Sequence, residues 1–244
     1  MIRRESGFTI IETSLVLAVT GLIIAVVLAG IGNSLNHQRY TDAVNQAVDF
    51  FRGQYTQTTS VMNNRPADES CSALGVSVAA SPMSRGASDC LLLGQVIRSS
   101  NGQDITVSQL LALHDPSDDT NVASASDADI LSASQLEEGS KVDEYSLEWG
   151  ARLLAPSSKD AAKFTLVVLR VPVSGTVRTY SSVSDTIPVA DLVRSPDASA
   201  DDLRVCVDQS GFFGGVGVSP VGIAIDKGAN NTTGVKIIPS GDCA

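Results

Sequence analysis

The chain opens with a long run of apolar residues. From Leu15 to Ile31 it reads LVLAVTGLIIAVVLAGI, in which Thr20 is the only polar side chain. Counted from Phe8 to Gly32, the helix-compatible stretch has about 25 residues and a length of about 37 Å as an α-helix. That length spans a hydrocarbon core of about 30 Å, and secretory signal cores are shorter. The pattern therefore predicts a membrane-spanning helix over residues 8–32 rather than a plain signal peptide.

The residues after this run repeat apolar side chains at helical spacing. Steps of three and four place one apolar stripe on residues 33–62. The stripe consists of Tyr40, Val44, Ala47, Val48, Phe51, Tyr55 and Met62. We therefore expect the helix to continue beyond the membrane as an amphipathic half, and to end at the NNRP sequence of residues 63–66.

The remainder, residues 63–244, has the pattern of a β-rich head. Short segments rich in Val, Ile and Leu and bounded by turn residues predict strands. They lie at 90–98, 163–173, 176–180, 203–208, 221–226 and 234–239, with a less regular candidate at 141–149. Residues 226–234 are expected to connect a hairpin, and residues 115–129 to form a polar surface loop.

Two further segments of the head are predicted to be helical. The sequences TVSQLLALHD (106–115) and DADILSASQLEEG (127–139) both begin with residues that cap helices. The expected fold class is therefore α+β, with a long N-terminal helix packed on a C-terminal antiparallel β-sheet.

The distribution of charge indicates an orientation and excludes one class of partner. The net charge is −10, and the 17 lysines and arginines form no cluster, which argues against direct nucleic-acid binding. Arg3 and Arg4 precede the apolar run, and Arg39 is the first cation after it. The positive-inside rule then places residues 1–7 in the cytoplasm and the head outside.

All four cysteines lie beyond the apolar run, at Cys71, Cys90, Cys206 and Cys243. An even number of cysteines in an exported region indicates disulfides. A zinc site is the alternative, but zinc-binding cysteines usually form close pairs, and these four are far apart.

Several candidate catalytic or metal-binding patterns are incomplete. No G-x-S-x-G accompanies His37 or His114, and the glycine-rich residues 211–217 lack the lysine of a phosphate loop. Oxygen-bearing residues alternate as in a calcium loop at Asp115, Ser117, Asp119 and Asn121. However, Thr120 and Ser126 stand where such a loop has glycine and glutamate. We therefore predict neither an enzyme nor a bound cofactor or metal.

Glu12 is the unusual residue of the apolar segment. A carboxylate within a spanning helix costs about 3 kcal/mol, and less near the helix end. The helix contains no lysine or arginine that could pair with Glu12. Either Glu12 reaches the headgroups, or its cationic partner comes from another molecule.

The sequence RRESGFTIIE (3–12), followed by a charge-free span, resembles the N-terminal motif of type IV pilins and type II secretion pseudopilins. The resemblance covers Arg3 to about Gly32. It implies cleavage after Gly7 by a prepilin peptidase, N-methylation of Phe8, and a role for Glu12 in assembly. Residues 1–7 would be the leader peptide and residues 8–32 the assembly helix. Unlike many major pilins, this chain has no proline in the helix.

The resemblance also implies a function and partners. The expected protein is a structural subunit of a type IV pilus-like filament, held in the membrane by lipid and then assembled with other pilin subunits by a platform. The large head suits a minor pilin as well as a major one. The alternative is an extracytoplasmic binding module on an ordinary signal-anchor, because the VLAGIG sequence at 27–32 has small residues that a signal peptidase accepts.

Four cysteines allow three pairings. The favoured one joins Cys71 to Cys90, which closes a short loop, and Cys206 to Cys243, which ties down a terminus that little else holds. Many pilins have a C-terminal disulfide loop. The cross-pairing of Cys71 with Cys206 and Cys90 with Cys243 requires a different strand order and stays open.

Overall fold

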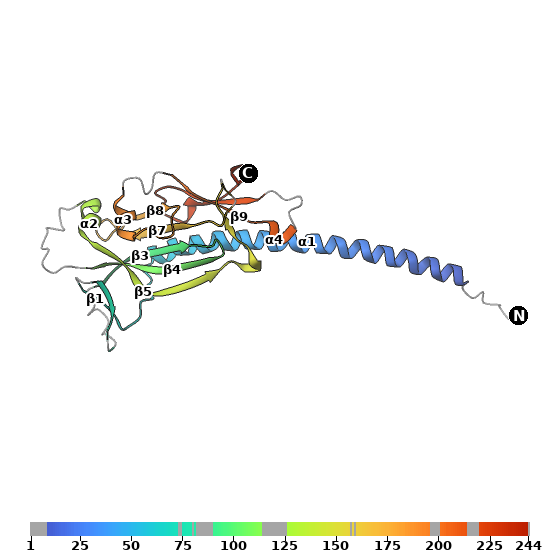
Figure 1. The fold of residues 1–244 in the computed structure, drawn as a ribbon, viewed down its shortest axis with the longest axis horizontal. Helices are drawn as coiled ribbons and strands as arrows, with labels where there is room; N and C mark the ends of the chain where they lie inside the picture. The colour runs from blue at the N-terminus through green and yellow to red at the C-terminus, as the bar shows by residue number, and fades with distance from the viewer. Residues whose placement is uncertain are drawn as a thin grey trace.

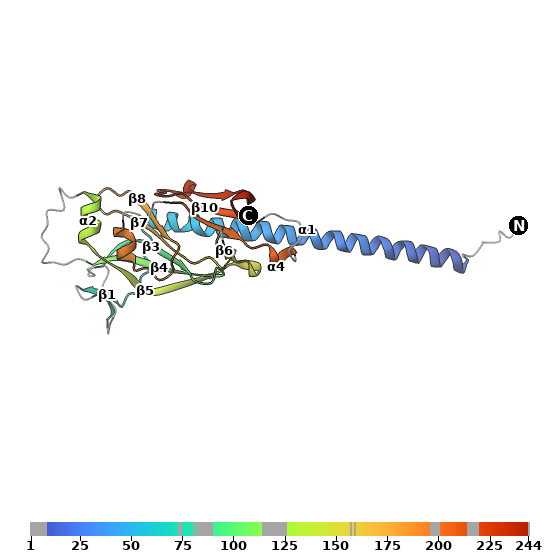
Figure 2. The same cartoon turned by 45° about the horizontal axis from the view of Figure 1, so that its top comes forward.

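The computed structural model describes residues 9–72, 75–79, 81, 90–113, 126–156, 158, 160–195, 201–213 and 220–243. A single helix, α1 (Ile10–Thr59), forms the first element of the described residues. Its N-terminal half projects from the head as a single rod, and its C-terminal half lies alongside the strands (Figures 1 and 2). The predicted continuation of the helix beyond the apolar run is confirmed.

Both ends of α1 are capped. Thr9 is the N-cap, and its hydroxyl accepts a hydrogen bond from the backbone N–H of Glu12 at 3.3 Å. At the C-terminal end the Met62 N–H donates to the carbonyl of Gln57, and the Val61 N–H donates to that of Thr58. This is a Schellman arrangement, in which Val61 takes the left-handed position (φ 51°) that usually holds glycine. The helix thus ends at Thr59, before the NNRP sequence.

The strands form three antiparallel sheets. The largest has the order β5-β4-β3-β7-β8, the second has the order β11-β10-β9-β6, and β1 and β2 form a hairpin. Their bounds are β1 (Glu69–Ser72), β2 (Gly75–Val78), β3 (Cys90–Ser99), β4 (Asp104–Leu113), β5 (Gln135–Ser146), β6 (Leu153–Leu154), β7 (Phe164–Arg170), β8 (Val177–Ser182), β9 (Leu203–Val207), β10 (Val221–Ile225) and β11 (Val235–Ile238).

Short helices complete the head. They are α2 (Asp127–Ala133), α3 (Val189–Arg194) and α4 (Ser210–Phe213), with 3-10 turns η1 (Glu148–Gly150), η2 (Thr232–Gly234) and η3 (Ser240–Cys243). In α2 the N-cap Ser126 and Asp129 form a reciprocal capping box. The expected connection at 226–234 indeed joins two paired strands, β10 and β11.

One hydrophobic core joins α1 to both large sheets. The buried stripe of α1 matches the predicted one from Tyr40 to Tyr55, whereas Met62 lies outside it and is half exposed. The stripe packs with side chains of the five-stranded sheet (Ile97, Ile105, Phe164, Leu166, Val168) and of the four-stranded sheet (Leu203, Val205, Val207, Ile223, Ile225, Val235). The expectation of one sheet is therefore corrected to two sheets that share the helix.

The five-stranded sheet is buried on both faces. Along β7, Leu166 and Val168 belong to the core around α1, whereas Val167 and Leu169 pack with α2 and α3. This alternation follows from the period of two in a strand. It explains why residues 166–169 read as a continuous apolar run, because such runs are typical of strands covered on both sides.

The prediction of a helix at 106–115 is wrong, because residues 104–113 form β4. Leu110 and Ala112 pack on the side of α2 and α3, and Leu111 and Leu113 pack near the Cys71–Cys90 disulfide. Because β4 is buried on both faces, its apolar residues occupy adjacent positions, and this pattern was mistaken for that of a helix. The predicted helix at 127–139 holds only as far as Ala133, since β5 begins at Gln135. The strand candidate at 141–149 ends at Ser146, before η1.

Candidate functional site

The N-terminal half of α1 exposes apolar side chains around its whole circumference. From Ile10 to Leu35 every large hydrophobic residue is exposed, by 88% at Ile10 and still by 45% at Leu35. The most apolar window has a mean hydropathy of 2.7, and none of it is buried. A helix that is apolar all round requires a surrounding apolar medium, either lipid or other helices. By length and composition this half is a candidate single membrane span.

Glu12 lies on the first turn of α1, next to the cap at Thr9. The unpaired N–H groups of a helix N-terminus carry partial positive charge, so a carboxylate is favoured there over one in mid-helix. The first cation further along the helix is Arg39, about 40 Å away at 1.5 Å per residue. No lysine or arginine of α1 can therefore neutralise Glu12. Gly7 and Phe8, the predicted cleavage and methylation residues, lie outside the described residues.

The entry of α1 into the head is marked by Tyr40. Its hydroxyl donates to the carbonyl of Val207 at 3.2 Å and accepts from the N–H of Val221 at 2.8 Å. The ring makes an edge contact with Phe212 of α4 at a centroid distance of 5.5 Å. Burial raises the pKa of Tyr40. Tyr40 thus fixes the helix to the four-stranded sheet at the first buried turn.

Arg39, the residue before Tyr40, contacts a strained turn at the place where α1 enters the head, which we call the rim of the head. In the turn Glu148–Ala151, the N–H of Ala151 donates to the carbonyl of Glu148, and Trp149 (φ 58°) and Gly150 (φ 70°) both have positive φ. These are the features of a type I′ turn, in which asparagine or glycine normally precedes the glycine. The guanidinium carbon of Arg39 lies 5.0 Å from the centroid of the Trp149 ring, and Trp149 as a residue is 53% exposed.

The left-handed backbone of Trp149 carries a cost in strain. A left-handed backbone costs about 1–2 kcal/mol for a residue with a Cβ. An exposed cation–π contact returns only about 0.5–1 kcal/mol. The contact with Arg39 therefore offsets only part of the strain at Trp149, and about half of the residue stays exposed on the folded head.

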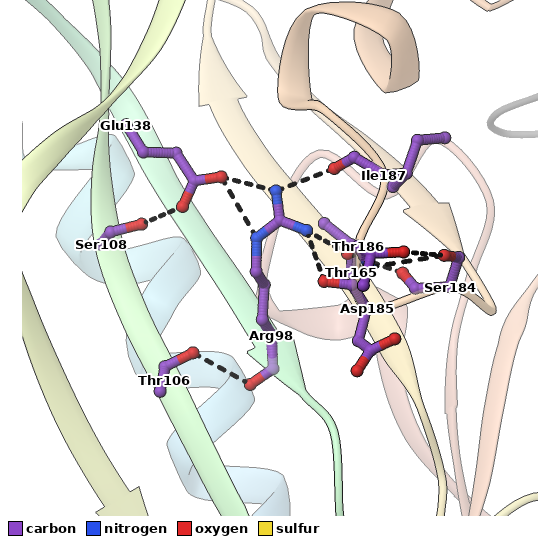
Figure 3. A network of polar contacts seen from close by, with 9 residues as sticks. All are labelled: Arg98, Thr106, Ser108, Glu138, Thr165, Ser184, Asp185, Thr186 and Ile187. Carbon is purple, nitrogen blue, oxygen red and sulfur yellow. Dashed lines mark hydrogen bonds and ion pairs between the residues drawn. The ribbon is translucent and has the colours of Figure 1, made fainter.

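A second polar centre is built around Arg98 of β3 (Figure 3). The guanidinium donates twice to Glu138, once to the Thr165 hydroxyl, and once each to the carbonyls of Asp185 and Ile187. All five donors of the arginine fork are engaged. Glu138 also accepts from Ser108 at 2.8 Å. The network joins four strands of the sheet, β3, β4, β5 and β7, to the segment before α3, and we interpret it as a structural clasp.

The two disulfides join Cys71 to Cys90 and Cys206 to Cys243, as favoured from the sequence. The first links β1 to the start of β3. The second ties the C-terminal turn η3 to β9, where Gly222 of the neighbouring strand leaves room: a Cβ on Gly222 would lie 2.8 Å from the Cys243 sulfur. The alternative cross-pairing is wrong, and all described cysteines are paired.

The other predicted residues form no site within the described part of the chain. His37 lies exposed on α1, whereas His114 falls outside the described residues. Asp115, Ser117, Asp119, Thr120 and Asn121 also lie outside them. The last position of that loop pattern, Ser126, caps α2. Among the described residues, no three His, Cys, Asp or Glu side chains gather as a metal site would require.

Sequence reasoning missed Trp149 and Arg98. The signal for Trp149 was its being the only tryptophan, placed directly before a glycine. The signal for Arg98 was a charge within an otherwise apolar strand. Comparison with known proteins adds no assignment: no protein-family model matches the chain, and no curated protein or solved structure is significantly similar to it.

Proposed function

We propose that this chain is a structural subunit of a type IV pilus-like filament, stored in the membrane and assembled through α1. The observation that carries the proposal is the division of one continuous helix. Its N-terminal half is apolar on all sides and exposed, and its C-terminal half is built into a disulfide-bonded head. Lipid covers the exposed half before assembly, and the same halves of other subunits cover it in a filament.

The N-terminal residues supply the chemistry of assembly. Cleavage after Gly7 leaves Phe8 with an α-amino group, which has an ordinary pKa near 8 and is mostly cationic. Such an amine on a staggered neighbouring subunit can reach Glu12. At about 4 Å and an effective dielectric of 20, the attraction is about 4 kcal/mol before desolvation. The carboxylate that is costly alone in lipid is then favourable between subunits.

Processing is tested by the mass of the mature N-terminus. We expect the chain from cells that contain a prepilin peptidase to begin at N-methylated Phe8, and a bulky residue at Gly7 to leave the precursor uncut. A mature chain that begins near Gly30, or that retains Met1, contradicts the proposal. Either result indicates the alternative, an extracytoplasmic module on an ordinary signal-anchor.

Assembly is tested by changing the charge at Glu12. Glu12→Gln and Glu12→Val should both insert into the membrane but enter sheared surface filaments less than the wild-type chain, because the amine of Phe8 loses its counter-charge. Thr20→Val is the matched control, since it removes a polar group from the same exposed half without changing charge. Wild-type incorporation of both Glu12 variants would refute the pairing.

A further inference from the structure

We propose that the Trp149 turn is an interfacial anchor, by which the rim of the head contacts the headgroup layer of the bilayer that α1 spans. The inference rests on the proposed function only in requiring that α1 crosses a membrane before assembly. Its partner is a lipid surface rather than a second protein. The evidence is the position of Arg39 on α1, its contact with Trp149, and the strained and exposed conformation of Trp149.

The position of Arg39 on α1 matches the thickness of the headgroup layer. Arg39 lies seven residues beyond Gly32, where the apolar stretch ends, and thus about 10 Å along the helix axis. Side chains of a helix lean toward its N-terminus, which here is the side of the membrane. The headgroup region is about 5–7 Å deep on each side of the hydrocarbon core. An extended arginine at position 39 therefore reaches it with its guanidinium.

The chemistry of the pair fits that layer. Tryptophan is enriched at membrane interfaces, where its apolar ring and its N–H donor each find a partner. Arginine extends its charge to the phosphates while its stem stays in apolar surroundings. Arg39 and Trp149 are held together at 5.0 Å, so both enter the interface as one unit. The protein is acidic overall, so we expect the contact to form with zwitterionic rather than anionic lipid.

The strain at Trp149 is the third line of evidence. Asparagine would adopt the left-handed position more easily, and the head buries only about half of Trp149. Strained residues that stability does not explain are concentrated at functional positions. The strain and the exposure of Trp149 together indicate a contact outside the folded head.

The experiment uses Trp149 as its own probe, because it is the only tryptophan of the chain. The full chain is reconstituted into phosphatidylcholine vesicles that contain lipids brominated either close to the headgroup or deep in the acyl chain. We expect the shallow lipid to quench Trp149 emission more than the deep lipid. A matched control moves the tryptophan to the β7–β8 turn in Trp149→Asn with Val173→Trp. That turn lies near the far end of α1, since neighbouring Arg170 contacts the carbonyl of Thr59. Its emission should be unaffected by either lipid.

Three results would overturn the inference. One is wild-type emission that neither lipid quenches. Another is equal quenching of the relocated tryptophan. The third is an emission shift that appears only when subunits assemble, because the partner is then a neighbouring subunit. The N-terminal mass of the same sample separates the two proposals: unquenched Trp149 in a chain that begins at Phe8 removes this inference alone, and quenched Trp149 in a chain that retains Met1 removes only the pilin assignment.

Discussion

Replacement of Arg98 by alanine tests whether the clasp of Figure 3 holds the head together. The change removes five hydrogen bonds and leaves Glu138 with Ser108 as its remaining partner among the contacts of that network. Breaking a buried ion pair costs about 3–5 kcal/mol. The side chains are 19% and 33% exposed, so water compensates in part, and we expect a loss of about 2–3 kcal/mol.

The assay is thermal unfolding of the full chain in detergent, followed by circular dichroism. For a domain of this size, 1 kcal/mol corresponds to about 2–4 °C, so Arg98→Ala should lower the melting temperature by about 4–12 °C. Arg98→Lys should fall between the wild type and alanine, because an ammonium keeps the charge but has three donors instead of five.

The control asks whether the loss comes from the orphaned carboxylate. Arg98→Met combined with Glu138→Gln removes both charges and should melt closer to the wild type than Arg98→Ala does. If Arg98→Ala lowers the melting temperature by less than about 2 °C, the Arg98–Glu138 pair contributes no more than an ordinary surface ion pair, and the reasoning is refuted.

Three further predictions concern α1 and the disulfides. Burial raises the pKa of Tyr55 to about 12, against about 10 in the unfolded chain, so its contribution to stability is complete below pH 10 and is lost as the pH rises toward 12. The free energy of unfolding should therefore fall by about 1.3 kcal/mol between about pH 9 and about pH 11, as measured by urea titration, and it should fall less in Tyr55→Phe, which has no phenol to ionise. Val61→Gly should raise the melting temperature by relieving the left-handed valine, with a gain of about 1 kcal/mol, and a decrease would contradict this. Replacing both Cys206 and Cys243 by serine should cost about 4 kcal/mol, against about 3 kcal/mol for the shorter Cys71–Cys90 loop, in denaturant titrations without reductant; the reverse order would contradict the loop-entropy argument.

Helical periodicity was sufficient to predict the second half of α1. The predicted apolar stripe from Tyr40 to Met62 repeats at steps of three and four over about six turns, and a strand would instead alternate every second residue. Three strands of the four-stranded sheet, β9, β10 and β11, were also predicted, since turn residues bound each of them, whereas the two-residue strand β6 was not. Periodicity failed in β4, where burial on both faces placed apolar residues at adjacent positions. A sequence pattern shows how apolar each position is, but it does not show on which face of a strand or helix that position is buried.

The pairing of strands and the polar centres depend on contacts between distant residues. The missing side chain of Gly94 in β3 lets the backbone of β7 approach closely, because a Cβ on Gly94 would lie 2.0 Å from the Val168 oxygen. Arg98 likewise gains its role only when residues 138, 165 and 185–187 meet it. The disulfide pairing was easier to predict, because it was argued from the sequence separation of the cysteines and from the position of Cys243 near the C-terminus, both of which can be read from the sequence.

The continuity of α1 also gives the molecule a mechanical character. No linker separates the exposed half from the half inside the head, so tension or torque applied to one is transmitted to the other. A pull along the axis would shear the helix against both sheets at once, over the buried stretch from Tyr40 to Thr58, which is about 27 Å long. Hydrogen bonds from Tyr40 and Tyr55 to strands of different sheets resist that sliding at two levels. The head is therefore carried as a rigid extension of the rod, and it can be pulled off only by rupture of its own core.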